Sequence, residues 1–126
     1  MRLGAARRAL TMELLLASAI ALLTATGVYL LLRARTFPVV LGLTFLSYAV
    51  NLFIFCAGGV RVGQPPIVGA SIAPADPLPQ GLVLTAIVIG FAMTAYLVVL
   101  AIQSRAHHGT DHVDGAEPPA THRDRR

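Results

Sequence analysis

Charged side chains are scarce in this chain, and their scarcity limits the possible folds. Asp, Glu, Lys and Arg together make up 13% of the 126 residues, about half of the roughly 25% that is usual in a soluble domain. Three long stretches contain none of them: residues 14–32, 36–57 and 77–104. Each stretch reaches the roughly 18 to 20 apolar residues that cross a hydrocarbon core of about 30 Å. A soluble globular fold is excluded, because it needs far more polar surface.

The chain also has only one cysteine and no lysine. The single cysteine, Cys56, excludes an intrachain disulfide and is expected to behave as a small buried apolar residue. Because lysine is absent, the ten permanently positive side chains are all arginines, and they lie outside the three charge-free stretches. Arginines in such positions set membrane topology and contact lipid headgroups. The net charge of +4 therefore does not predict nucleic-acid binding, since no patch of basic and aromatic residues accompanies it.

The sequence predicts an all-α integral membrane protein with three transmembrane helices. We expect an N-terminal extension at residues 1–11, a membrane domain at 12–104 and a disordered polar tail at 105–126. The predicted helices are residues 13–32, 37–57 and 77–103. The first two should form an antiparallel hairpin, because only a few residues separate them.

The orientation in the membrane depends on where the protein starts. We expect translation to begin at Met12, which removes the first eleven residues. Arg61 then stands alone on the N-terminal side, against three arginines near helix ends on the other side: Arg33, Arg35 and Arg105. By the positive-inside rule, the hairpin turn and the tail would then be cytoplasmic.

Proline and glycine punctuate the ends of the predicted helices. Gly58 and Gly59 suit the C-terminal cap of the second helix. The following loop, residues 60–75, is rich in Gly and Pro and is too short for a domain. A four-residue motif at the entrance of the third helix comprises Asp76, Pro77, Pro79 and Gln80. Its prolines fit a first helical turn, and its aspartate can cap the free amides there.

Small residues at four-residue spacing indicate where helices approach closely. Ala17, Ala21 and Ala25 recur in this way on the first helix. The third helix carries a second strip, formed by Ala86, Gly90 and Thr94. Such strips allow a neighbouring backbone to pack tightly in a membrane.

Three uncharged polar residues share one face of the second helix: Thr44, Ser47 and Asn51. One interpretation is hydrogen bonding between helices. The other is a hydrated path that is completed by charges from a partner protein of the same complex. No ionisable residue lies at mid-membrane depth in any of the three helices, although a proton or cation pathway normally needs one. The chain is therefore a poor candidate for an ion carrier on its own.

The polar tail contains histidines that invite a metal-site interpretation. His108 and His112 would share a helical face if the third helix continued, as zinc ligands can. Gly109 weakens that helix, and no further ligands are in place. The tail is expected to be solvated and to bind no metal.

The most specific signal is the run DPLPQGLVLTAIVIGF at residues 76–91. It resembles the signature of the C subunit of Mrp-type multisubunit sodium/proton antiporters. The run GLTFLSYAVNL at residues 42–52 and the PPI sequence at 65–67 support the resemblance. The match covers about residues 12–105, which is the whole membrane region.

That family is related to the K subunit of the proton-pumping NADH-quinone oxidoreductase. The K subunit carries a glutamate in its second helix and another in its third, and these fall at Thr44 and near Met93 here. Neither residue is acidic, a departure that favours the antiporter branch over a K-like component of a proton pump.

The resemblance implies a subunit of a secondary transporter in the bacterial cytoplasmic membrane, and not an enzyme. Large many-helix subunits would hold the ionisable pathway, and this chain would pack against them and against membrane lipids. The transporter would exchange sodium or another monovalent cation for protons and support pH homeostasis. No bound cofactor is expected.

Two other classes remain as alternatives. A stand-alone small exporter typically has four helices and a glutamate near the middle of the first, whereas Glu13 stands at the edge of the first helix. A membrane anchor would use the basic, histidine-rich tail as its working part.

Overall fold

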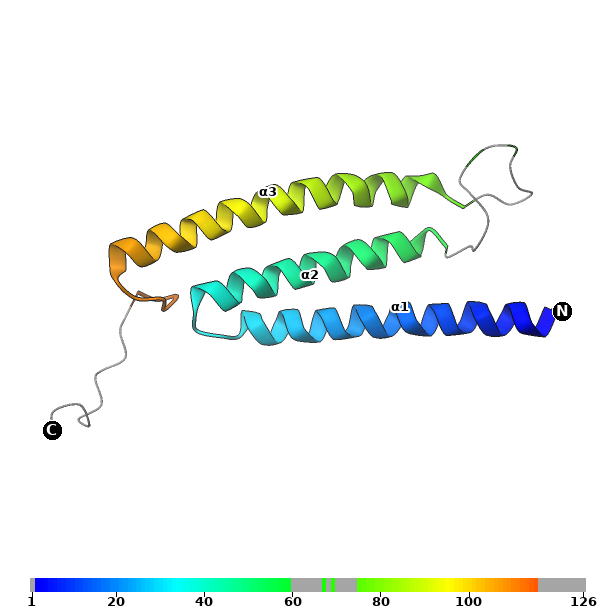
Figure 1. Ribbon diagram of the computed structural model, residues 1–126, viewed down its shortest axis with the longest axis horizontal. Coiled ribbons are helices and arrows are strands. Elements are labelled where there is room, and N and C mark those ends of the chain that lie inside the picture. The colour runs from blue at the N-terminus through cyan, green and yellow to red at the C-terminus, as the bar shows by residue number, and fades with distance from the viewer. Residues whose placement is uncertain (1, 60–66, 68, 70–74, 116–126) are drawn as a thin grey trace, which may run out of the picture.

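Three long helices account for most of the protein in the computed structural model, which describes residues 2–59, 67, 69 and 75–115 (Figure 1). Helix α1 spans Arg2–Leu31, α2 spans Thr36–Ala57 and α3 spans Pro77–His108. The all-helical prediction is confirmed, and α2 begins within one residue of its predicted start. The proline- and glycine-rich loop and the end of the tail lie outside the described residues, except for Ile67, Gly69 and Ala75.

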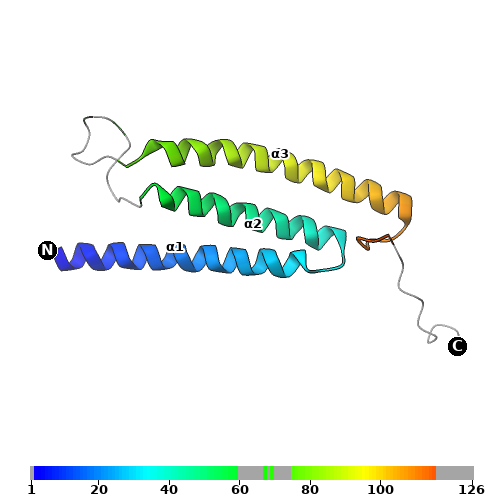
Figure 2. The same ribbon diagram turned by 180° about the vertical axis from the view of Figure 1, so that it is seen from behind.

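The helices form a single layer with α2 in the middle (Figures 1 and 2). Helix α2 packs against α1 on one side and α3 on the other, whereas no Cα atom of α1 lies within 8 Å of one in α3 in the described ranges. The turn between α1 and α2 covers residues 32–35, so the first two helices form the predicted antiparallel hairpin. In this arrangement only α2 has helical neighbours on both sides.

Both outer helices are longer than predicted. Helix α1 begins at Arg2, not near residue 13, because alanine, leucine and arginine dominate residues 5–10 and all favour helix. Helix α3 continues to His108, not residue 103, because the sequence offers no helix breaker before Gly109. Gly109 ends the helix in the left-handed region at φ 68° and donates its N–H to the Arg105 carbonyl, which is a glycine C-cap.

Large apolar side chains cover most of the surface. Phe91 is 79% exposed and Leu22 is 70% exposed, and many others are similar. Among the described residues, the buried apolar side chains are only Val40, Ala49, Ala75 and Val83. All three helices are long and apolar enough to cross a membrane, so lipid or other protein must cover these side chains.

Two glycines set the contact between α1 and α2. A Cβ atom added to Gly42 would lie 2.7 Å from the Gly27 carbonyl oxygen and 2.8 Å from the Leu31 nitrogen. The two backbones therefore touch at this crossing, and no larger residue fits. The alanine strip of α1 does not form this crossing: Ala17 and Ala21 line a cavity of about 520 Å³ nearer the other end of the hairpin.

Candidate functional site

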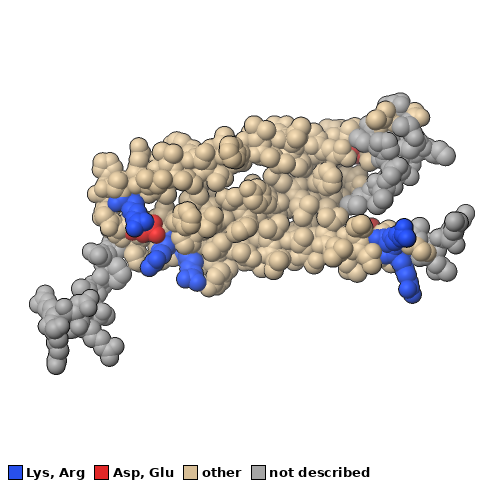
Figure 3. All heavy atoms as spheres, viewed as in Figure 1, with Lys and Arg blue, Asp and Glu red and all other residues tan. Residues whose placement is uncertain are grey.

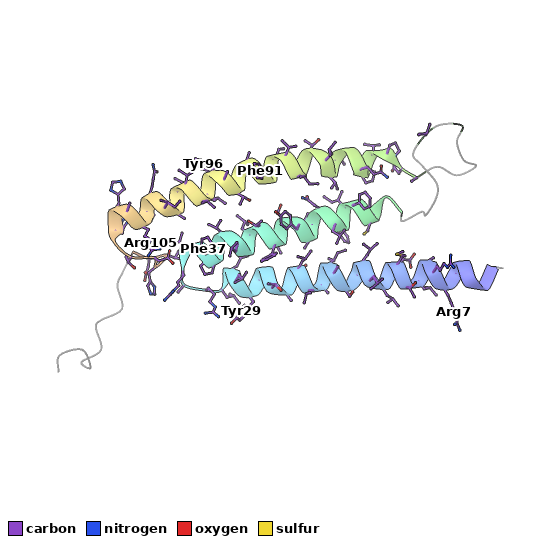
Figure 4. All side chains as sticks on the ribbon, viewed as in Figure 1. Arg7, Tyr29, Phe37, Phe91, Tyr96 and Arg105 are labelled. Atoms are coloured by element: carbon purple, nitrogen blue, oxygen red, sulfur yellow. The ribbon has the colours of Figure 1, made fainter. Side chains whose placement is uncertain are left out.

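Charged side chains gather at the two ends of the helical layer, and the band between them carries none (Figure 3). Arg7 lies near the start of α1, whereas Arg105, Tyr29 and Phe37 lie toward the opposite end of the layer (Figure 4). The uncharged band can bind other helices or lipid, but it offers no ionisable carboxylate, amine or imidazole that could carry a proton.

The polar stripe of α2 and the small-residue strip of α3 face each other across one groove. A cavity of about 520 Å³ opens between the two helices, where the space-filling view is hollowed (Figure 3). Six residues that the sequence singled out line it together: Thr44, Ser47, Asn51, Ala86, Gly90 and Thr94. Sequence reasoning treated the two strips separately, because the pairing of two helices cannot be read from either one alone.

The threonines in this α2–α3 groove satisfy their hydroxyl groups within their own helices. Thr44 donates to the Val40 carbonyl at 2.9 Å, and Thr94 donates to the Gly90 carbonyl at 2.8 Å. Their two hydroxyl oxygens lie 3.5 Å apart. That separation is long for an O–H···O bond, which usually measures about 2.5 to 3.0 Å. The contact across the helices is therefore a weak one.

Ser47 and Asn51 differ from the threonines. Within the described part of the chain, neither the Ser47 hydroxyl nor the Asn51 side-chain amide has a hydrogen-bond partner. Both side chains are half-buried. Asn51 also lines a neighbouring cavity of about 400 Å³, which Leu23 of α1 and Val83 of α3 reach. Asn51 thus lines both of these cavities beside α2.

Gly90 faces α2 but is not tightly enclosed. A Cβ atom added there would lie 3.4 Å from the Ser47 hydroxyl oxygen, and no other atom comes within 4 Å. The strip of Ala86, Gly90 and Thr94 thus lines an open groove, in contrast to the direct backbone contact between α1 and α2.

The helix-entrance motif lies at the start of α3, outside the α2–α3 groove, and has a structural role. Asp76 is the N-cap of α3, and its Oδ1 accepts a hydrogen bond from the Leu78 N–H at 3.0 Å. Pro77 and Pro79 occupy the first turn, and Gln80 is half-buried beside them. A Cβ added to Gly58 would lie 2.8 Å from the Pro79 ring, so this motif packs the start of α3 against the end of α2.

The first part of the tail, for which the sequence predicts disorder or loose binding, is folded back onto the hairpin turn. The Thr36 N–H donates to the Asp111 carbonyl at 3.0 Å, and the Val113 N–H donates to the Ala34 carbonyl at 3.1 Å. We call this two-bond pairing the clasp. Extended backbone on both sides permits it, because Gly109 turns the chain at the end of α3. No apolar pattern in the tail indicates it.

The histidines near the clasp do not share a helical face. His108 is the last residue of α3, and its Nδ1 lies 3.0 Å from the Ser104 carbonyl oxygen. His112 lies beyond Gly109 and is paired with Arg35 in the clasp. Across residues 2–59 and 75–115, no three His, Cys, Asp or Glu side chains come together as metal ligands would.

Comparison with known proteins places these features in a family. The model of the NADH-ubiquinone/plastoquinone oxidoreductase chain 4L family matches residues 15–117. A probable K(+)/H(+) antiporter C subunit of Rhizobium meliloti is 60% identical over 111 residues, which cover 84% of this chain and 96% of that protein. The C1 subunit of an Na(+)/H(+) antiporter of Staphylococcus aureus is 43% identical over 104 residues, 82% of this chain and 92% of the relative.

Solved structures agree. A chain in the structure of the Mrp complex from Dietzia sp. is 36% identical and superposes with a TM-score of 0.64, covering 87% of this chain and 89% of that one. A chain of the membrane-bound sulfane sulfur reductase, an archaeal respiratory membrane complex, is 33% identical with a TM-score of 0.69, covering 82% and 97%. The three-helix layer is thus found in two kinds of membrane complex.

Proposed function

The chain belongs to the NADH-ubiquinone/plastoquinone oxidoreductase chain 4L family, in the branch of the antiporter C subunits, and we propose that it is the C subunit of a multisubunit monovalent cation/proton antiporter. It spans the bacterial cytoplasmic membrane three times, and other subunits of the antiporter are its partners. It is a transporter subunit and performs no enzymatic reaction. Its role is to complete the assembly that carries out exchange.

The relatives named as antiporter subunits carry this proposal. The relative from Rhizobium meliloti is identical at 60% of the aligned positions and is matched along 96% of its length, so the likeness covers the whole subunit and not one motif. The uncharged membrane band points to a supporting role. A pathway for protons and cations normally needs ionisable groups, which large many-helix partners would supply.

A component of a respiratory complex is the second candidate, favoured by the family description and by the sulfane sulfur reductase structure. Two residues argue against it. By the resemblance to the K subunit, its glutamates fall at Thr44 and near Met93, and both of these residues line the α2–α3 groove. The chain therefore has an uncharged groove at the place where a K subunit would carry carboxylates.

The cation is not the same in the two relatives, since one is named for potassium and the other for sodium. The experiment that tests the proposed function therefore compares sodium with potassium. Everted vesicles from a strain that lacks its own antiporters would contain the complete complex, the complex without this chain, or this chain alone. A fluorescent pH-gradient probe would follow the response to added Na⁺ or K⁺.

We expect exchange only from the complete complex, and its recovery when this chain is supplied from a second gene. NADH oxidation by the same membranes should not change. Robust exchange by the chain alone would overturn the proposal, as would full exchange without it. A loss of NADH-quinone reductase activity on deletion would instead favour the respiratory candidate.

A further inference from the structure

Asn51 places an amide group well inside the membrane. Helix α2 has 22 residues, about 33 Å at 1.5 Å per residue, which matches a hydrocarbon core of about 30 Å. Asn51 lies seven residues before Gly58 and so about 10 Å from that end of the helix. At this depth the surrounding lipid tails offer no hydrogen bonds.

The asparagine amide cannot satisfy its hydrogen-bonding groups within its own helix as the threonine hydroxyls do. Thr44 returns its hydroxyl proton to the carbonyl four residues earlier, and Ser47 can do the same by rotating its side chain. The Asn51 amide has two N–H donors and one carbonyl acceptor to satisfy. Leaving such a group unpaired in an apolar medium costs about 1 to 3 kcal/mol by protein mutational data. Asn51 therefore requires a partner beyond the described residues of this chain.

Water is a poor partner here, because the α2–α3 groove is mainly apolar. Its walls include Leu43, Val50, Ile89 and Leu97 beside the few polar groups, and large apolar cavities stay dry. Lipid tails can fill the volume but leave the amide unpaired. A transmembrane helix can both fill the volume and pair with the amide. Ala86 and Gly90 on the opposite wall let another backbone approach closely.

We propose that a transmembrane helix of another antiporter subunit occupies the α2–α3 groove and presents a side chain that both donates to and accepts from the Asn51 amide. An amide, a hydroxyl or a protonated carboxyl group has this chemistry. The proposal rests on the proposed function in one respect, because it takes this chain to be one subunit of a complex. Ser47, four residues earlier on the same face, adds a second hydrogen-bonding group along the groove.

The first experiment identifies the occupant by photo-cross-linking in the complete complex. Cys56 is the only cysteine, so Cys56→Ser gives a cysteine-free background. A benzophenone maleimide would be attached at Ile89→Cys, which lines the groove and leaves Asn51 in place. The matched control is Phe91→Cys, also on α3 (Figure 4) but outside the groove. We expect the Ile89 probe to form an adduct with one helix of another subunit, and the Phe91 probe not to reach that helix.

Other adducts overturn the inference. A lipid adduct alone would show that acyl chains fill the groove, and an adduct with a second copy of this chain would show a homodimer. Labelling of Ile89→Cys in the complex by a small, membrane-impermeant thiol reagent would show a water-filled groove. If the complex purifies with cation exchange intact and the inter-subunit adduct is missing, the inference fails and the proposed function stands. If the chain purifies without any other subunit, both fail.

The second experiment tests the hydrogen bond itself. Asn51→Leu keeps the side-chain size but removes the amide, and we expect about three- to twentyfold weaker association with the other subunits, the range of interhelical hydrogen bonds in membranes. Asn51→Gln keeps the amide and should recover part of the loss. Thr85→Val, on α3 but outside the groove, should stay within about twofold of wild type because Thr85 bonds to its own helix. Equal effects of Asn51→Leu and Thr85→Val would overturn the assignment.

Discussion

The two helix–helix contacts of this protein differ in how completely they close. Between α1 and α2, Gly27 and Gly42 bring the backbones into direct contact, and an added Cβ at Gly42 would meet backbone atoms at 2.7 and 2.8 Å. Between α2 and α3, an added Cβ at Gly90 would meet one hydroxyl oxygen at 3.4 Å, and a cavity of about 520 Å³ remains.

The α1–α2 contact is therefore complete within this chain, whereas the α2–α3 contact leaves a groove open. Helix α3 is joined to the hairpin near its two ends, by Pro79 against Gly58 and by the clasp. Between these ends the groove separates much of α3 from α2, and Ser47 and the Thr44–Thr94 pair reach across it. A closed contact should make substitutions costly in the isolated chain, whereas an open groove should make them costly only in the complex.

The largest effect is expected at the closed contact. Gly42→Leu would force a side chain against the backbone of α1, which cannot move aside cheaply, and we expect a loss of about 3 kcal/mol in the free energy of unfolding. Unfolding of the isolated chain by SDS in mixed micelles would measure it. The control is Gly81→Leu, where a Cβ meets nothing within 4 Å, so that variant should be no less stable than wild type. Equal stability of the two variants would show that the hairpin is not closed by glycine.

A smaller and more selective effect is expected in the open groove. Gly90→Leu fills space that the chain itself leaves empty, so the isolated chain should lose no more than about 1 kcal/mol of stability. The amount of assembled complex on a native gel should fall several-fold, because the incoming helix meets the new side chain. Gly90→Ala, whose Cβ only reaches the Ser47 hydroxyl, is the control. Wild-type assembly with Gly90→Leu would show that this face meets lipid.

The smallest effect is expected from the threonine pair that bridges the groove. Thr44 and Thr94 each donate to their own helix, and their oxygens lie 3.5 Å apart. A double-mutant cycle with Thr44→Val and Thr94→Val should therefore give a coupling free energy below about 0.5 kcal/mol. The same micelle unfolding assay would measure it. A coupling above about 1 kcal/mol would mean that α2 and α3 are closed by this pair, and the contrast between the two contacts would be weaker than the structure shows.

Sequence reasoning found the helices but not the contacts between them. Absence of charge located three spans, and proline and glycine located the end of α2 and the start of α3, because both signals are local. The Gly27–Gly42 crossing was missed, since helices that are apolar all round show no preferred face from which to choose a partner. The polar stripe at Thr44, Ser47 and Asn51 was visible, but its position opposite Gly90 depends on the register of two helices.

The ends of the outer helices were missed for a related reason. Predicted bounds followed the charge-free stretches, whereas α1 and α3 continue past them as far as local helix propensity allows. The clasp at residues 111–113 left no trace in composition, because its bonds run between backbone groups and depend on no side-chain pattern. Function was predictable chiefly through the resemblance at residues 42–52 and 76–91, not from the polar residues themselves.

The clasp also has a consequence for the order of events during biosynthesis. Thr36 bonds to Asp111, 75 residues later in the chain. The backbone of the turn between α1 and α2 is therefore fully paired only after α3 and the residues that follow it have been made. A ribosome-bound chain that ends within α3 has a complete hairpin and an incomplete turn. We therefore expect the Thr36 amide to exchange with solvent until the clasp forms, so its protection from exchange would report that the tail has docked on the turn.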